Sequence, residues 1–177
     1  MVATTGTNQR GGSGPPPFGW PWTSGAYGWT EPTAWGVLAL RARRPSASER
    51  IADGLDTLAQ RECAEGGWNY GTPESFGVAE PPFVQTTAVA LFATAGIDQG
   101  LTRRGLAALR ARWRSESAGL LTLATATAAF RRLGDADAGD ATDALEHAVV
   151  SDAESDTVAL AWAALALGPG LQALSVG

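Results

Sequence analysis

The 177-residue sequence predicts an all-α fold made of repeated helical hairpins. Seven segments carry apolar residues at helical spacing, and no segment shows the alternation of a half-buried strand. A glycine-tryptophan loop that leads into a helix also occurs twice, from Gly19-Trp20 to Thr33 and from Gly67-Trp68 to Thr87. Because each repeated unit buries its apolar face against its neighbours, we expect a stack of similar helical units.

Composition limits the class of protein. Residues 18–170 suit a single domain, between a polar, flexible leader at 1–17 and a short tail at 171–177. Cys63 is the only cysteine, which excludes an internal disulfide and favours a reducing, cytoplasmic compartment. The net charge is −5 and no basic cluster is present, so nucleic acid is not expected as a partner. No apolar run reaches the length of about 18 residues that a transmembrane span requires.

The first hairpin is predicted from proline, serine and leucine positions. Its first helix covers 31–44, where a proline occupies the first turn and another proline follows the end. Ser46 or Ser48 is expected to cap the second helix. The apolar stripe of that helix consists of Ile51, Leu55 and Leu58.

A long irregular segment separates the first hairpin from the second. Glycine and proline residues over 64–82 exclude a regular helix and predict an aromatic loop without strands. The third helix is expected at 83–95, ending at a left-handed Gly96. A fourth begins at Thr102 and presents one apolar face, formed by Leu106, Leu109 and Trp113.

Three further helices are expected at 117–133, 140–150 and 152–167, the last capped by Asp152 or Asp156. The third, fifth and seventh helices are rich in alanine and threonine, whereas the second, fourth and sixth carry charges and a narrow apolar stripe. A helix that is apolar on nearly every side is usually enclosed by other helices. We therefore predict an inner row of helices covered by an outer row.

The sequence QRECAEGGW at 60–68 fits the Gln-x(2–5)-Gly-x-Trp repeat and resembles that of squalene and oxidosqualene cyclases. The helix starts at Thr33 and Thr87 are similar to the inner helices of those cyclases and of protein prenyltransferase β subunits. The resemblance is strongest over 19–96 and implies an α/α toroid, a ring of hairpins around an apolar cavity. Since the chain supplies too few hairpins for a closed ring, we expect a partial toroid, completed by another copy or a partner protein.

The resemblance implies a hydrophobic, isoprenoid-like ligand in an aromatic-lined cavity. No cofactor is expected, because the sequence lacks the metal-binding motifs of these enzymes. Aromatic faces stabilise a carbocation by about 0.5–2 kcal/mol per ring. The candidate lining residues are Trp20, Trp22, Trp29, Trp35, Trp68, Tyr70 and Phe83. In the alternative interpretation, Gln60 and Trp68 hold adjacent hairpins together, the indole by packing on the next unit and the amide by satisfying loop backbone groups.

Catalytic groups of the related enzymes are absent. The Asp-x-Asp-Asp acid of cyclases is missing, and the nearest acidic string, 135–140, is interpreted as a solvated turn. Cys63 and His147 lack the spacing of a zinc site, so no metal is expected. Glu31 and Glu80 are the candidate acids, each preceding a proline near the start of an inner helix, where capping is the competing explanation.

The arginines of the fourth predicted helix could in principle attract a diphosphate. The arginines of the fourth predicted helix spread around it and do not converge, so a solvated face is favoured over a diphosphate site. These arginines are Arg103, Arg104, Arg110, Arg112 and Arg114.

The leading functional hypothesis is a terpenoid cyclase- or prenyltransferase-like protein that holds a hydrophobic ligand, with catalysis left open. The alternative is a structural module whose half-ring surface mediates homo- or hetero-oligomerisation, because large exposed apolar patches mark interfaces or ligand grooves. A third possibility is that the chain is one end of a longer cyclase whose acid lies elsewhere.

Overall fold

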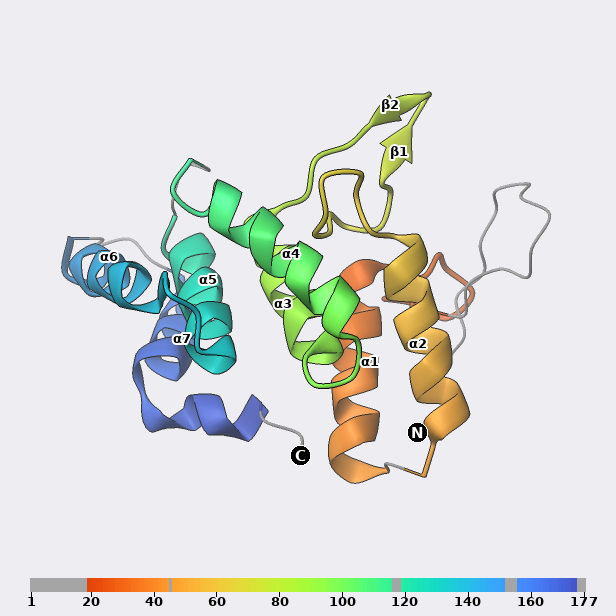
Figure 1. Ribbon diagram of the computed structural model, residues 1–177. Helices are drawn as coiled ribbons and strands as arrows, with labels where there is room; N and C mark the ends of the chain where they lie inside the picture. Colours follow the sequence, from red (N-terminus) through yellow and green to blue (C-terminus); the bar gives the residue numbers. More distant parts are fainter. Residues whose placement is uncertain (1–18, 45, 116–118, 152–155, 175–177) are drawn as a thin grey trace.

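The computed structural model describes residues 19–44, 46–115, 119–151 and 156–174, so the predicted leader at 1–17 lies outside it (Figure 1). Its elements are α1 (Thr30–Arg43), α2 (Ser48–Gln60), β1 (Glu74–Ser75), β2 (Val78–Ala79), α3 (Val84–Thr94), α4 (Gln99–Arg112), α5 (Leu120–Leu133), α6 (Ala138–Ser151), α7 (Thr157–Leu167) and the 3₁₀ helix η1 (Pro169–Leu174). The prediction of an all-α fold is confirmed. Within these ranges, every helix is too short or too polar to cross a lipid bilayer.

The helices form two rows (Figure 1). Helices α1, α3, α5 and α7 pack side by side in chain order, and α2, α4 and α6 each pack on the odd-numbered helix that precedes them. In α3, 10 of the 11 residues are buried, as its alanine- and threonine-rich sequence predicts for an enclosed helix. The predicted inner and outer rows are therefore present, but α7 is exposed along one face where enclosure was expected, and the partial toroid stays a prediction.

The two glycine-tryptophan loops make the same backbone contacts. The N–H of Trp20 donates to Thr33 Oγ1 at 2.9 Å, and the N–H of Trp68 donates to Thr87 Oγ1 at 2.9 Å. The carbonyl of each tryptophan then accepts a hydrogen bond from the residue just before the next inner helix, Trp29 at 3.1 Å or Phe83 at 3.0 Å. The internal repeat inferred from the sequence is thus a repeat of hydrogen bonds.

These equivalent contacts change which residues of the two repeats correspond to each other. Because Trp29 and Phe83 occupy the same position, Glu31 corresponds to Gln85 and not to Glu80. Glu80 lies in the loop, four residues before Val84 begins α3. The helix dipole acts only within the first turn, so it does not account for an acid at position 80.

Glycines allow each outer helix to approach its tryptophan. A Cβ atom added to Gly54 of α2 would lie 2.9 Å from Cζ3 of Trp20, and one added to Gly105 of α4 would lie 2.6 Å from Cζ3 of Trp68. Real Cβ atoms essentially never come that close to a ring. The indole therefore fills the space between an inner and an outer helix in both hairpins.

Several predicted helix starts are corrected. Asp98 caps α4 by accepting the N–H of Leu101 at 2.9 Å, so the helix begins before Thr102. Neither Ser46 nor Ser48 caps α2, whose N-cap is Ala47 without a side-chain hydrogen bond.

The helix boundaries in the C-terminal half were also predicted from the sequence, and one of them is confirmed. Asp156 caps α7 as predicted, accepting from Ala159 N–H at 2.8 Å, whereas Asp152 lies outside the described residues. The predicted start of α5 at 117 also lies outside them, and Leu120 is the first described helical residue. Part of the predicted tail, up to Leu174, belongs to η1.

The prediction that 64–82 contains no strand is wrong. β1 and β2 form an antiparallel hairpin that projects from the helices (Figure 1). Its turn consists of Phe76 at φ 52° and Gly77 at φ 80°. Two successive left-handed residues match the twist of a hairpin. Phenylalanine rarely adopts that conformation, so only Gly77 marked the turn in the sequence.

The acidic string after α5 is not a solvated turn. The side chain of Asp135 is buried and pairs with Arg110 of α4, and it also accepts the N–H of Asp137 at 3.0 Å. Asp137 accepts the indole N–H of Trp113 at 2.7 Å. These bonds join α4 to the start of α6.

The arginines of α4 are likewise engaged, which corrects the expectation of a merely solvated face. Arg104 pairs with Glu62 at 2.7 Å and Arg112 pairs with Glu65 at 2.7 Å. Both acids lie just beyond the end of α2. Such pairs are largely exposed to solvent, which screens them, so they contribute little to stability.

Candidate functional site

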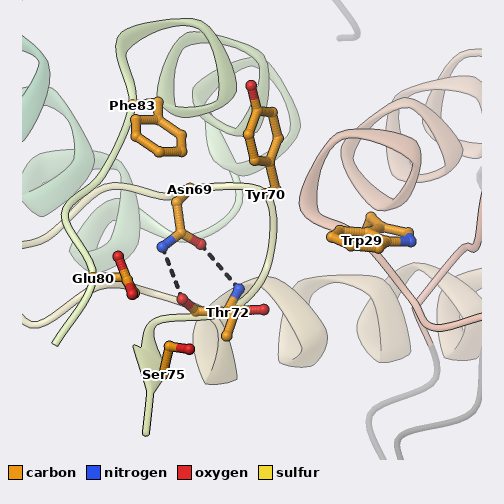
Figure 2. Close-up of a pocket in the computed structure, with 7 residues that line it drawn as sticks. All are labelled: Trp29, Asn69, Tyr70, Thr72, Ser75, Glu80 and Phe83. Carbon is orange, nitrogen blue, oxygen red and sulfur yellow. Dashed lines mark hydrogen bonds between the residues drawn. The ribbon is translucent and has the colours of Figure 1, made fainter. Parts of the chain in front are cut away.

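A pocket of about 290 Å³ lies where the loop before α3 meets the N-terminal ends of the inner helices (Figure 2). We call it the aromatic pocket. Trp29 immediately precedes α1, Phe83 immediately precedes α3, and the loop supplies the rest. Its lining residues are Trp29, Asn69, Tyr70, Thr72, Ser75, Glu80 and Phe83.

Asn69 fixes the loop that carries the pocket. Its Oδ1 accepts the N–H of Thr72 at 3.0 Å and its Nδ2 donates to the carbonyl of Thr72 at 2.9 Å (Figure 2). The same Oδ1 also accepts the N–H of Gly71 at 3.0 Å. Asparagine favours such turns because its short amide reaches the backbone a few residues on. Asn69 is not among the site residues predicted from the sequence, although an asparagine two residues before a glycine is an available signal for such a turn.

The side chain of Arg61 also binds the backbone of this loop. Its Nη1 donates to the carbonyl of Gly71, and its guanidinium lies 3.9 Å from the ring centroid of Tyr27. The side chain of Gln60, which was expected to satisfy the loop backbone, is exposed and its amide forms no hydrogen bond within the described part of the chain. That prediction is wrong, and the role belongs to Asn69 and Arg61.

Three aromatic rings line the pocket. Tyr70 and Phe83 lie with their centroids 5.1 Å apart, and Trp29 is held edge-on by Tyr27 at 5.4 Å. Tyr70 is 58% exposed, so its ring has a face available to a ligand. In Figure 2, Tyr70 and Phe83 lie above the loop, while Trp29 and Glu80 are on opposite sides of it.

The carboxylate of Glu80 is half-buried and has no hydrogen-bond or ion-pair partner among the described residues. Only its backbone is bonded, with the N–H donating to the carbonyl of Pro73 at 2.9 Å. A partly desolvated acid without a partner is available to a ligand.

A second, more enclosed pocket of about 130 Å³ lies between the inner helices. We call it the inner pocket. All four inner helices contribute to it, and Tyr70 lines both pockets. Its lining residues are Glu31, Tyr70, Gln85, Thr86, Val89, Leu121, Thr125, Val158 and Trp162.

An aromatic cluster includes the inner pocket residue Trp162. The ring of Trp162 stacks on Phe92 of α3 with centroids 6.2 Å apart and lies 6.1 Å from Trp35 of α1. Trp35 also donates its indole N–H to Glu31 at 3.4 Å. Trp35 therefore contacts two residues of the inner pocket but does not itself line it.

The remaining predicted aromatics lie elsewhere. Trp68 is fully buried and donates its indole N–H to the carbonyl of Leu58 at 2.7 Å, which is the hairpin-joining role of the alternative interpretation. Trp20 packs between α1 and α2 beneath the guanidinium of Arg50, 3.6 Å from the ring centroid. Trp22 is 63% exposed and lines neither pocket.

No group of three or more metal-ligating side chains occurs in the part of the chain that the structure describes. Cys63 lies in the loop just after α2, and burial raises the pKa of its thiol. His147 is exposed on α6. The two residues do not form a site.

Comparison with known proteins leaves the family open. No family model matches the chain, and searches of curated proteins and of solved structures gave no significant match. The resemblance to terpenoid cyclases and prenyltransferases therefore stays a prediction based on 60–68 and on the two helix starts.

Proposed function

We propose that this protein binds an elongated, largely apolar ligand of isoprenoid-like character across the aromatic pocket and the inner pocket. The observation that carries the proposal is that Tyr70 lines both. A ligand that passes this ring has one end among Trp29 and Phe83 and the other between the inner helices.

The two volumes support a ligand with an extended shape. The aromatic pocket, at about 290 Å³, lies at the lower limit for small-molecule sites. The inner pocket, at about 130 Å³, is close to the size of a cavity that holds a benzene ring. Neither is large enough for a compact polycyclic ligand, whereas a chain can occupy both.

The inner pocket also has a suitable surface for a hydrocarbon chain. Val89, Leu121, Val158 and Trp162 supply apolar atoms. Of the polar lining residues, Glu31, Gln85 and Thr86 lie at helix starts, and Thr125 lies within α5, where its hydroxyl donates to the carbonyl of Leu121 at 2.9 Å. Burial of each CH₂ group contributes about 0.8 kcal/mol. The proposal is one of binding and assigns no reaction.

Titration calorimetry with farnesol, an uncharged prenyl alcohol, tests this function. The aromatic-pocket variant Trp29→Ala is expected to weaken binding about tenfold, the loss of roughly 1.4 kcal/mol of contact. Trp22→Ala is the matched control, because it removes an exposed tryptophan outside both pockets. No farnesol binding by the unaltered protein, or equal affinities of all three proteins, would reject the proposal.

A second candidate function, self-assembly, is favoured by the surface of α7. This helix is apolar apart from Thr157, yet Val158, Leu160, Ala161 and Ala164 are exposed. Since the exposed alanines allow close helix approach, a second copy packing α7 against α7 about a twofold axis is the partner we propose. Sedimentation should then detect a dimer that Leu160→Glu dissociates, and a monomeric unaltered protein would exclude this role.

A further inference from the structure

We infer that the aromatic pocket recognises a positively charged, methylated ammonium group, so that the ligand is a cationic amphiphile and not an anionic isoprenoid diphosphate. The inference rests on the proposed function and specifies the chemistry of one end of the ligand. It follows from the rings, the charges and the hydrogen bonds of the pocket.

The rings provide the first argument. A cation near an aromatic face is attracted by the ring quadrupole, and the attraction increases when the cation is shielded from water. Trp29, Tyr70 and Phe83 border one hollow, and the Tyr70 and Phe83 rings are inclined at 54° to each other. Inclined rings contact a compact, nearly spherical group from more than one direction, as a methylated ammonium requires.

The charges provide the second argument. Glu80 lines the aromatic pocket, Glu31 lines the inner pocket, and no lining residue of either pocket is basic. The nearby guanidinium of Arg61 is directed to the Gly71 carbonyl and the Tyr27 ring and does not line the pockets. A diphosphate would therefore meet acids without a compensating cation, whereas an ammonium group would meet a carboxylate.

The hydrogen bonds provide the third argument, which favours a methylated over a primary ammonium. A primary ammonium has three N–H donors to satisfy. The amide oxygen of Asn69 already accepts two hydrogen bonds within the loop and the carbonyl of Thr72 accepts one, so the acceptors left for an ammonium are one charged group, the Glu80 carboxylate, and hydroxyl groups such as that of Ser75. A fully methylated ammonium needs no acceptor, and the rings with one carboxylate are sufficient for it.

The test compares choline with 3,3-dimethylbutan-1-ol, its uncharged isostere, by calorimetry and by NMR shifts of pocket residues. The isostere has the same shape, so only the charge differs. We expect choline to bind at least about fivefold more tightly. Glu80→Gln should reduce choline affinity about threefold to tenfold and leave the isostere unaffected. The exposed acid Glu49 supplies the matched control, Glu49→Gln.

The outcomes separate this inference from the proposed function. Three outcomes would overturn the cationic assignment, even where farnesol still binds. They are equal binding of choline and its isostere, no choline binding at all, and choline affinity unchanged in both Glu80→Gln and Trp29→Ala. If the unaltered protein binds choline but not farnesol, the proposed binding of an apolar ligand across the two pockets is rejected instead. Circular dichroism of each variant verifies that the fold is retained.

Discussion

The indole N–H of Trp68 donates a hydrogen bond to the carbonyl oxygen of Leu58 at 2.7 Å, which connects the loop before α3 to the end of α2. The same residue binds Thr87 of α3 through its backbone N–H and packs its ring on Gly105 of α4. One residue thus contacts three helices through its backbone and its side chain, and it joins the first hairpin to the second.

Substitution of Trp68 should separate the hydrogen bond from the packing. Trp68→Phe keeps an aromatic ring but loses the indole donor, and we expect a loss of about 1 kcal/mol in the free energy of unfolding. Trp68→Ala also leaves a cavity and should lose about 3–5 kcal/mol. Urea unfolding measures both values, and similar losses for the two variants would contradict this division.

Replacement of Gly105 tests the close approach of α4. A methyl group there would meet the buried Trp68 ring at 2.6 Å and Leu91 at 3.1 Å, so Gly105→Ala should destabilise the fold by about 1–3 kcal/mol. Gly139→Ala in α6 is the control, because nothing lies within 4 Å of its Cβ position. Since alanine is the better helix former, the control should gain up to about 1 kcal/mol in thermal or urea unfolding.

Acid should weaken the contact between α4 and the start of α6. Burial alone would raise the pKa of Asp135, but hydrogen bonds from Arg110 and from the Asp137 N–H hold this pKa below its ordinary value of 3.8. The unfolded chain therefore binds more protons at low pH. The contribution of Asp135 is complete above about pH 4 and is lost as the pH falls through the folded-state pKa.

Asp135→Asn should remove this component of the pH dependence and lower stability at neutral pH by about 1–3 kcal/mol. The exposed Asp143 provides the control variant Asp143→Asn, which should follow the unaltered protein. Urea unfolding between about pH 6 and pH 3 gives the comparison. An identical acid slope in the unaltered protein and in Asp135→Asn would refute the assignment.

Cys63 should react slowly in the folded protein. Burial raises the pKa of its thiol and also restricts access to it. The thiolate is the reactive form, so alkylation by iodoacetamide at about pH 8 should be at least tenfold slower in the folded chain than in urea, as an order-of-magnitude estimate. Mass spectrometry follows the reaction, and equal rates would show that the thiol is accessible.

Filling the inner pocket should affect only the apolar end of the ligand. Leu121 lines that pocket and is partly exposed, so Leu121→Trp is expected to reduce its volume and to weaken farnesol binding about tenfold. Choline, which needs only the aromatic pocket, should bind as before. Parallel loss of both ligands in calorimetry would indicate that the two pockets are not separable.

The sequence predicted the rows of helices because composition and burial are linked. The alanine- and threonine-rich segments became α3 and α5, which are enclosed, and the amphipathic ones became α2, α4 and α6. The repeat was also visible, since glycine and tryptophan occur together where an indole must fit between helices. Regular periodicity carries this information without any knowledge of the tertiary contacts.

The site was less predictable because it depends on irregular backbone. The roles of Asn69 and Arg61 arise from a loop whose course local sequence does not specify. The aromatic residues were selected as one group, but only Trp29, Tyr70 and Phe83 line the aromatic pocket. Trp20 and Trp68 had the same composition signal and serve the packing of hairpins instead, a difference that only their neighbours determine.

The duplicated set of threonine, tryptophan and glycine contacts has a consequence for modular engineering. In each hairpin the inner helix, the loop and the outer helix are held together by the same three contacting residues. These are Thr33, Trp20 and Gly54 in the first hairpin and Thr87, Trp68 and Gly105 in the second. We therefore expect that an additional hairpin with the same three residues can be inserted between the two, which would lengthen the protein by one repeat unit without redesign of the contacts between units.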